Sequence, residues 1–268
     1  MPAVSRVERQ WDLNRENFDG RWLGCSRWFQ RSKAGDLDLT EPSEVIEDTC
    51  YDISFLDQDT GLWDGSGLKF APGGTARHPI SSKIYNQSGH CWQFRGAGGQ
   101  SSVQLTAGSK RFAHELNFFQ GRSRSMLVLI WIEQDERWRL DAVCAVPFRC
   151  GRSTPAEPQR LTDGRPLQQQ LAELTGWGGA LESLTPGEAG LPAAVGAAEP
   201  FALERFCRHG ITAAFCDGLI CSVPETLSTG AFTLEVGCRV APECFQQLSL
   251  IYDEAQRLQR WERRTYQP

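Results

Sequence analysis

The sequence predicts an all-β protein made of two tandem antiparallel units. Short runs of β-branched, aromatic and alternating apolar residues follow one another, separated by turn residues such as Gly, Asp and Ser. No helical segment intervenes within either series of runs, and strands at this spacing are typical of an antiparallel sandwich or barrel. A stretch rich in proline and glycine at 150–166 interrupts the series. We therefore expect one unit over 1–155 and a second, shorter one over 156–268.

The first unit is expected to begin with a short helix at 11–19, where Asp12 and Asn14 provide capping side chains. Within 126–132 the residues of both faces are apolar, which predicts a strand that is covered on both sides. The glycines at 96–99 are expected to form a turn. Strands are expected near 20–31, 44–56, 61–70, 80–87, 90–95, 100–107, 110–119, 122–133 and 136–149.

The second unit repeats this order of elements on a shorter length. Each unit opens with a short helix and then a tryptophan beside glycines, Trp22 in the segment GRWLG and Trp177 in the segment LTGWGG. We interpret this as an internal repeat, the alternative being two unrelated tryptophans at strand starts. A helix is expected at 167–174 and a loop at 185–199. Strands are expected near 176–184, 200–208, 211–216, 219–223, 230–240, 245–253 and 257–266.

Composition and charge exclude several classes of protein. The 268 residues carry a net charge of −5 and no long basic run, which argues against a nucleic-acid partner. No run reaches the roughly 18 apolar residues of a membrane helix, so no membrane span is expected. The N-terminal residues lack the apolar segment of a secretory signal, so a cytoplasmic location is expected, or the plastid stroma in a eukaryote. The 10 cysteines are scattered without a C-x-x-C pair, which predicts reduced thiols and no metal site.

Motifs of known catalytic centres are missing from the sequence. There is no G-x-S-x-G segment and no P-loop, and no cysteine has a histidine placed to activate it. Enzymatic activity is left open on this basis, and a non-enzymatic role is favoured.

Segments along nearly the whole chain resemble an uncharacterised family of cyanobacteria and plastids with two calycin-like units in tandem. The G-x-W motif of its first strand, Gly20-Arg21-Trp22 here, is shared with calycins, the superfamily of lipocalins and fatty-acid-binding proteins. The family is similar in turn to the S-type and T-type phycobiliprotein lyases, calycin barrels that deliver a linear tetrapyrrole to a cysteine of an apoprotein. The segments are ENFDGRWLG (16–24), ELNFFQGRSRSMLVLIW (115–131), LTGWGGALESLTP (174–186) and LICSVPETLSTGAFTLEVGCRVAP (219–242).

This resemblance implies two tandem antiparallel calycin-like, or lipocalin-like, β-barrels with short helices at the barrel entrances. It also implies that the protein binds a hydrophobic carboxylate in its cup: a bilin or other tetrapyrrole, a carotenoid derivative or a fatty acid. No cofactor is implied beyond such a bilin or lipid.

Two alternatives to a simple binding protein stay open. The first is a phycobiliprotein chromophore lyase or chaperone, whose partner would be a phycobiliprotein or another photosynthetic apoprotein. The second is an assembly factor whose barrels are filled by side chains, with no cavity above about 300 Å³.

A polar cluster around the turn at 120–121 is the candidate ligand site. Its members are Arg111, His114, Glu115, Asn117, Arg122 and Arg124. Period-two alternation puts Glu115 and Asn117 on one strand face and His114 on the other. Arg122 and Arg124 follow the turn and lie across from Glu115 and Asn117. A Glu–Arg pair would then hold a ligand carboxylate or ring nitrogen at the mouth of the barrel. The alternative is a surface ion pair of little energetic value.

Tryptophans are expected in two roles. The tryptophans expected as candidates to line the cup are Trp28, Trp63, Trp92, Trp131 and Trp138, with core packing as the alternative for most of them. In calycins a basic residue at the end of the last strand often packs over the G-x-W tryptophan, so the resemblance implies a structural contact of Arg149 with Trp22. Trp177 is expected to have the corresponding structural place in the second unit.

Overall fold

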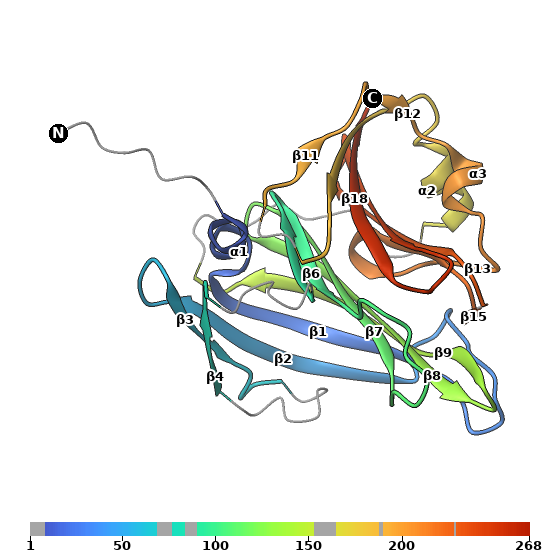
Figure 1. Cartoon of the computed structure of the whole chain (residues 1–268), viewed down its shortest axis with the longest axis horizontal. Coiled ribbons are helices and arrows are strands. Elements are labelled where there is room, and N and C mark those ends of the chain that lie inside the picture. Colours follow the sequence, from blue (N-terminus) through green and yellow to red (C-terminus); the bar gives the residue numbers. More distant parts are fainter. Residues whose placement is uncertain (1–8, 69–76, 84–89, 153–164, 188–189, 228) are drawn as a thin grey trace.

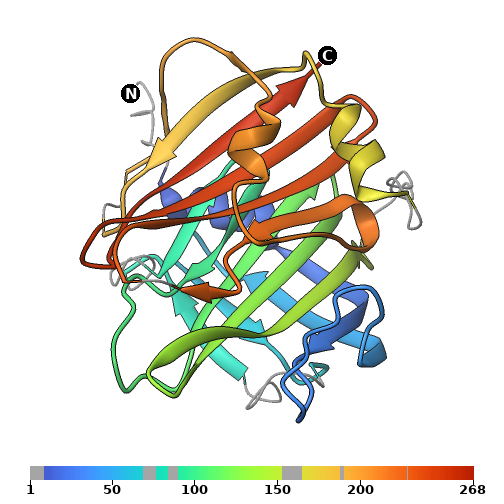
Figure 2. The same ribbon diagram turned by 90° about the vertical axis from the view of Figure 1, so that its right-hand side faces the viewer.

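Two curled antiparallel sheets form the protein, and they lie face to face (Figures 1 and 2). The computed structural model describes residues 9–68, 77–83, 90–152, 165–187, 190–227 and 229–268. A mostly antiparallel β architecture, as predicted, is confirmed. The expected boundary between 155 and 156 lies outside the described residues, as do the last residues of the strands expected at 61–70 and 80–87.

The first sheet curls into a half-barrel, with strands in the order β4-β3-β2-β1-β9-β8-β7-β6-β5. Helix α1 (Gln10–Phe18) precedes it, close to the predicted bounds. Because β4 and β5 are free edges of this path, the described residues form an open half-barrel and not the closed barrel that we expected. The strands are β1 (Gly20–Gln30), β2 (Glu44–Phe55), β3 (Thr60–Asp64), β4 (Arg77–Ser81), β5 (Cys91–Phe94), β6 (Ala97–Ser101), β7 (Phe112–Gln120), β8 (Ser123–Gln134) and β9 (Arg137–Cys150).

The second sheet has the order β11-β10-β18-β17-β16-β14-β13, and β12 pairs with β10. Helices α2 (Leu167–Ala172) and α3 (Leu203–Phe206) lie beside it (Figure 1). The strands of this half are β10 (Gly178–Leu184), β11 (Ala193–Ala194), β12 (Glu199–Pro200), β13 (Ile211–Ala214), β14 (Leu219–Val223), β15 (Thr226–Leu227), β16 (Phe232–Ala241), β17 (Cys244–Tyr252) and β18 (Leu258–Gln267).

Both sheets wind in the same way. In each, the first strand pairs with the last, β1 with β9 and β10 with β18, and the preceding strands follow in descending order. In each, an arginine at the hairpin leading into the penultimate strand lies 4.8 Å from a tryptophan ring, Arg122 over Trp22 and Arg239 over Trp177. The topology therefore agrees with the internal repeat inferred from the sequence.

The largest apolar core lies between the two sheets. On β8, Leu127 and Leu129 belong to this core, whereas Met126 and Val128 pack on the concave side of the first sheet. Both faces of this strand are covered, as its unbroken apolar pattern predicted. The concave side of the first sheet is thus backed by a buried apolar layer.

Two tryptophans from different sheets meet in this core. Trp92 of β5 stacks on Trp261 of β18, with ring centroids 5.6 Å apart. Both indole N–H groups donate to the Ser101 hydroxyl oxygen, at 3.0 and 3.2 Å. Tertiary contacts of this kind bind the two halves of the chain into one packed unit.

Backbone hydrogen bonds also cross between the halves. Strand β15, from the second half of the sequence, pairs with β9 of the first sheet, Leu227 opposite Trp138. Farther along, the N–H of Leu258 donates to the carbonyl of Val103 at 2.8 Å. The second half therefore supplies part of the first sheet.

Two predicted strands are wrong in kind or place. Residues expected as a strand at 200–208 include helix α3, because the N–H groups of Phe206 and Cys207 bond back four residues and Phe206 is buried. The strand expected at 100–107 is β6, which includes Gly98 and Gly99. A side chain at Gly99 would collide with the Glu115 carbonyl, so glycine permits a close strand approach here instead of a turn.

No α-helix in the part of the chain that the structure describes has the length and apolar character needed to cross a membrane.

Candidate ligand cavity in the first sheet

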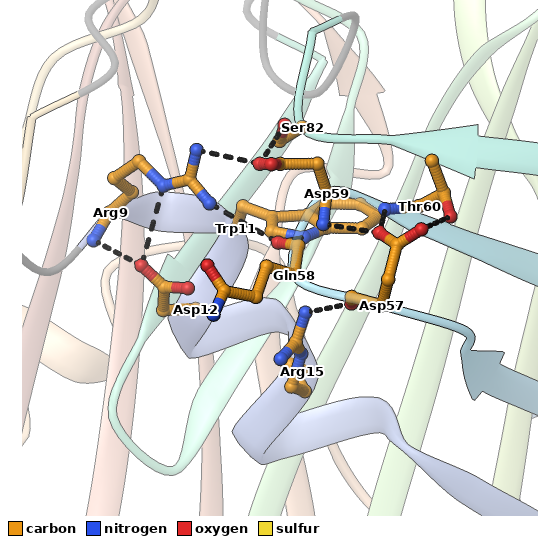
Figure 3. A network of polar contacts seen from close by, with 9 residues as sticks. All are labelled: Arg9, Trp11, Asp12, Arg15, Asp57, Gln58, Asp59, Thr60 and Ser82. Atoms are coloured by element: carbon orange, nitrogen blue, oxygen red, sulfur yellow. Dashed lines mark hydrogen bonds and ion pairs between the residues drawn. The ribbon is translucent and has the colours of Figure 1, made fainter.

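Helix α1 lies across the gap between the two free edges of the half-barrel (Figure 1). Figure 3 shows its attachment to the turn between β2 and β3. Trp11 Nε1 donates to the Gln58 carbonyl at 2.9 Å, and the Arg9 guanidinium donates to the Asp59 carboxylate at 3.0 Å. These contacts hold the start of the helix against the β2–β3 turn.

Buried amides hold α1 to the edge strand β5. The Gln10 side chain donates to the Gln93 carbonyl at 2.9 Å and accepts from the Gln93 N–H at 2.7 Å. Asn17 Nδ2 donates to the Phe94 carbonyl at 2.8 Å. Helix α1 is therefore bonded both to the β2–β3 turn and to the edge strand β5, and it links these two parts of the half-barrel.

The concave face of the first sheet contains two neighbouring cavities. The larger has a volume of about 440 Å³ and carries the exposed Arg111 at its rim. The smaller, about 220 Å³, lies next to Asn14 and Phe18 of α1. Gln100 and Glu115 line both cavities. Apolar side chains supply much of the remaining wall, with Trp28, Val128 and Ile130 in the larger cavity and Tyr51, Trp63 and Met126 in the smaller.

Glu115 is held in place by two members of the predicted polar cluster. Its Oε1 accepts from Asn117 Nδ2 at 3.0 Å and from Arg124 Nη2 at 3.2 Å. Arg124 Nε donates to Asn117 Oδ1 at 2.7 Å, which closes the triangle. The predicted pairing of a glutamate with an arginine across this hairpin is therefore present, and it lies on the concave face and not on the outer surface.

Arg124 is fully buried inside an aromatic cage. Its guanidinium carbon lies 4.8 Å from the Phe18 ring, 4.9 Å from Tyr51 and 5.0 Å from Phe148. Such ring faces stabilise a cation that has lost its water. Arg124 Nη1 is buried and has no hydrogen-bond partner within the described chain. The oxygen acceptors of this guanidinium are therefore those of Glu115 and Asn117.

Burial shifts the acid–base properties of this pair in opposite directions. Desolvation raises the pKa of the Glu115 carboxyl, and the hydrogen bond from Asn117 opposes the rise. Desolvation lowers the pKa of Arg124. A guanidinium retains its proton in proteins, so Arg124 remains the cation that stabilises an ionised Glu115.

Of the remaining members of the predicted cluster, Arg122 borders neither cavity, whereas His114 is among the residues that line the larger one. Arg122 donates to the carbonyls of Glu16 and Asp19 and so fastens the end of α1. His114 lies on the opposite face of β7, as predicted, between the rings of Phe112 and Trp131, with centroids 4.7 and 6.0 Å away. Burial lowers the pKa of His114 to about 3, so its ring is neutral.

Trp92 and Trp131, expected to line the cup, lie in the core between the sheets. Both are fully buried, and Trp131 Nε1 donates to the Pro224 carbonyl at 3.1 Å. Neither borders the two cavities. Strand alternation explains this placement, because each points to the face of the sheet opposite Glu115 and Val128.

The contact implied between Arg149 and Trp22 is replaced by another. In the ladder of β1 and β9, Trp22 is opposite Cys150 and Leu23 is opposite Arg149. Cross-strand partners share a face, so Arg149 points away from the Trp22 ring. Arg122 and Arg124 occupy that position instead, 4.8 and 5.5 Å from the ring.

Sequence reasoning named Trp28 and Trp63, which do line the cavities, but missed Gln100. Gln100 lies opposite Glu115 in the ladder of β6 and β7 and shares its face. The two glycines before it, which allow β6 to approach β7, were the available signal. Among the described residues no group of three or more His, Cys, Asp or Glu side chains is placed to hold a metal ion.

Comparison with known proteins relates the chain to one fold. A protein of unknown function from the DUF3598 family, from Nostoc punctiforme, superposes with a TM-score of 0.67 at 15% identity. The match covers 97% of this chain and 99% of that one. No family model matches the sequence, and no curated protein matches it either. The likeness at this identity shows a shared fold that extends over both sheets.

Proposed function

We propose that the chain is a binding protein for a small hydrophobic carboxylate, held on the concave face of the first sheet. The cavity of about 440 Å³ is the observation that carries the proposal. Ligand sites typically measure about 300–1,000 Å³ and combine apolar walls with a few polar groups. A cavity of this size favours ligand binding over the alternative of barrels filled by side chains.

The charges around the cavity favour an anionic end group on the ligand. Arg111 is exposed at the rim, whereas Glu115 lies farther in and is paired with Arg124. The site thus carries two guanidinium groups against one carboxyl. We propose that the ligand carboxylate meets Arg111, whose planar fork suits a carboxylate, while the body lies against Trp28, Val128 and Ile130.

A filling substitution tests this function. Val128→Phe puts a larger side chain into the cavity, whereas Val45→Phe makes the same change at a position on β2 that is 44% exposed. The probes are stearate and biliverdin, which represent the fatty-acid and bilin classes. Native mass spectrometry measures the complex, and quenching of tryptophan fluorescence measures the affinity.

We expect one probe molecule per chain at micromolar concentration, lost in Val128→Phe and retained in Val45→Phe. If neither stearate nor biliverdin binds to the unaltered protein, the proposal is contradicted. If biliverdin binds, adding a phycobiliprotein apoprotein separates storage from chromophore transfer, since a lyase passes the bilin to the acceptor cysteine.

A further inference from the structure

We propose that this cavity selects carboxylates whose body also carries an N–H or O–H group, and that Glu115 accepts the hydrogen bond from that group. The inference rests on the proposed function and narrows its ligand class. On this inference, the cavity prefers ligands with a hydrogen-bond donor along the body to plain fatty acids, whose chains have none.

The first observation is the unequal use of the two Glu115 oxygens. Oε1 receives both internal donors, from Asn117 and Arg124. Oε2 accepts no hydrogen bond within the described chain. The Glu115 side chain borders both cavities, and 36% of its surface is accessible. An oriented carboxylate oxygen therefore faces the space that a ligand would occupy.

The second observation is that this orientation is fixed from behind. Arg124 cannot turn away, because it is fully buried among rings and bonded to Asn117. Asn117 is itself fully buried and also donates to the Gly98 carbonyl at 3.2 Å. Arg124 and Asn117 are thus positioning residues. They keep Glu115 Oε1 hydrogen-bonded, so that Oε2 is left to face the cavity.

Desolvation makes this oxygen selective. An alkyl chain laid against it would remove its water and return no hydrogen bond, which is unfavourable for a carboxylate. A ligand donor would restore the hydrogen bond that the displaced water had made. Sites built to pair a ligand N–H or O–H discriminate against analogues lacking it by at least about tenfold.

The spacing along the strand limits the shape of the ligand. Arg111 directly precedes β7, four residues before Glu115, and both border the larger cavity. At about 3.3 Å per residue, they are separated by about 13 Å along the strand. The ligand therefore carries its donor near the middle of an extended body and its carboxylate at one end. Gln100, beside Glu115 on β6, offers an amide to the same region.

The experiment compares two probes that differ by one hydroxyl group. Stearate has no donor along its chain, whereas a mid-chain hydroxystearate carries one hydroxyl about as far from its carboxylate as Glu115 lies from Arg111. Affinities are measured by tryptophan fluorescence for the unaltered protein, Glu115→Gln and Arg111→Gln. Glu115→Gln keeps the shape but puts an amide in place of the carboxylate. Thermal unfolding confirms that each variant is folded.

We expect the unaltered protein to bind hydroxystearate at least about tenfold more tightly than stearate. Glu115→Gln should reduce this preference, because a neutral amide replaces the charged acceptor, and it should leave stearate binding within about threefold. Arg111→Gln should weaken both probes equally. Equal binding of the two probes to the unaltered protein would overturn the inference and leave the proposed function intact, whereas binding of neither probe nor biliverdin would contradict the proposed function itself. The probe comparison needs no variant, so it stands even if Glu115→Gln fails to fold.

Discussion

Arg149 on β9 forms a two-point ion pair with Asp217, a residue of the second half of the chain. Nη2 lies 2.7 Å from Asp217 Oδ1, and Nη1 lies 3.1 Å from Oδ2. Ser125 on β8 donates to the same Oδ2. Asp217 has a left-handed backbone, with φ of 61°, in the turn before β14. The arginine expected to pack over Trp22 therefore joins the two sheets to each other.

Arg149→Ala should lower the free energy of unfolding by about 2 kcal/mol, because Asp217 is left buried without its cation. The Asp217 side chain is only 6% exposed, which makes the loss of its partner costly. The Arg149 side chain is 37% exposed, so the loss of stability stays below that expected for a fully buried pair. Arg139→Ala is the matched control. It lies on the same strand with the same 37% exposure and pairs with Glu225 at a looser 3.7 Å. Chemical denaturation should show a change of less than about 0.5 kcal/mol for Arg139→Ala. Equal losses in both variants would contradict the special role of Arg149.

Ser101→Ala should destabilise the protein by about 2–4 kcal/mol, because it leaves two buried indole N–H groups without an acceptor. The measurement is a double-mutant cycle with Trp92→Phe, which removes one of the two donors. In that background Ser101→Ala should cost at least about 1 kcal/mol less. Strictly additive effects would show that the shared hydroxyl does not stabilise the contact between the sheets.

Arg124→Met should cost about 3 kcal/mol, because it leaves the Glu115 carboxyl without its internal cation. The double variant Arg124→Met with Glu115→Gln should regain at least about 1 kcal/mol, since no unpaired charge remains. Urea denaturation at neutral pH measures both. A double variant less stable than Arg124→Met would mean that packing against the aromatic cage, and not charge, determines the loss.

His114 should make the protein acid-sensitive. Its pKa is lowered by burial from 6.5 to about 3, so the folded state keeps the ring neutral while the unfolded state takes up a proton below 6.5. The free energy of unfolding should therefore fall as the pH drops through this window, by about 1.4 kcal/mol per pH unit from this residue. Above pH 6.5 both states are neutral and the contribution disappears.

His114→Leu measures this contribution directly. The variant should lose stability less steeply than the unaltered protein on acidification, when unfolding is followed by circular dichroism. His209, whose pKa burial lowers to about 4, titrates in both proteins and cancels in the comparison. Parallel pH profiles would show that His114 is not the group responsible.

Local patterns in the sequence were sufficient to predict much of the first half. Helix α1 begins within one residue of its expected start, and the face of β7 that carries Glu115 and Asn117 follows from alternation alone. The Glu115–Arg124 pair follows from a hairpin whose turn position is evident in the sequence. These features depend on residues that are near one another in the chain.

Contacts between distant segments were not predictable in the same way. Alternation indicates that Trp131 faces a buried layer but does not say whether a ligand or a second sheet covers it. The partner of Arg149 depends on a pairing register, and a shift of one residue exchanges the two faces of a strand. The shared core therefore placed Trp92 and Trp131 away from the cavities, although their residue type suited a binding site.

The first half of the chain emerges from the ribosome before the second half, with which it shares its core. Residues up to 150 complete the first nine strands while the outer apolar surface of β8, including Leu127 and Leu129, still lacks its cover. That cover arrives only with β14–β18, about 100 residues later, at a synthesis rate of about 5–20 residues per second. During those seconds the nascent chain presents an aggregation-prone surface. We expect it to require a chaperone and to complete its folding only after release.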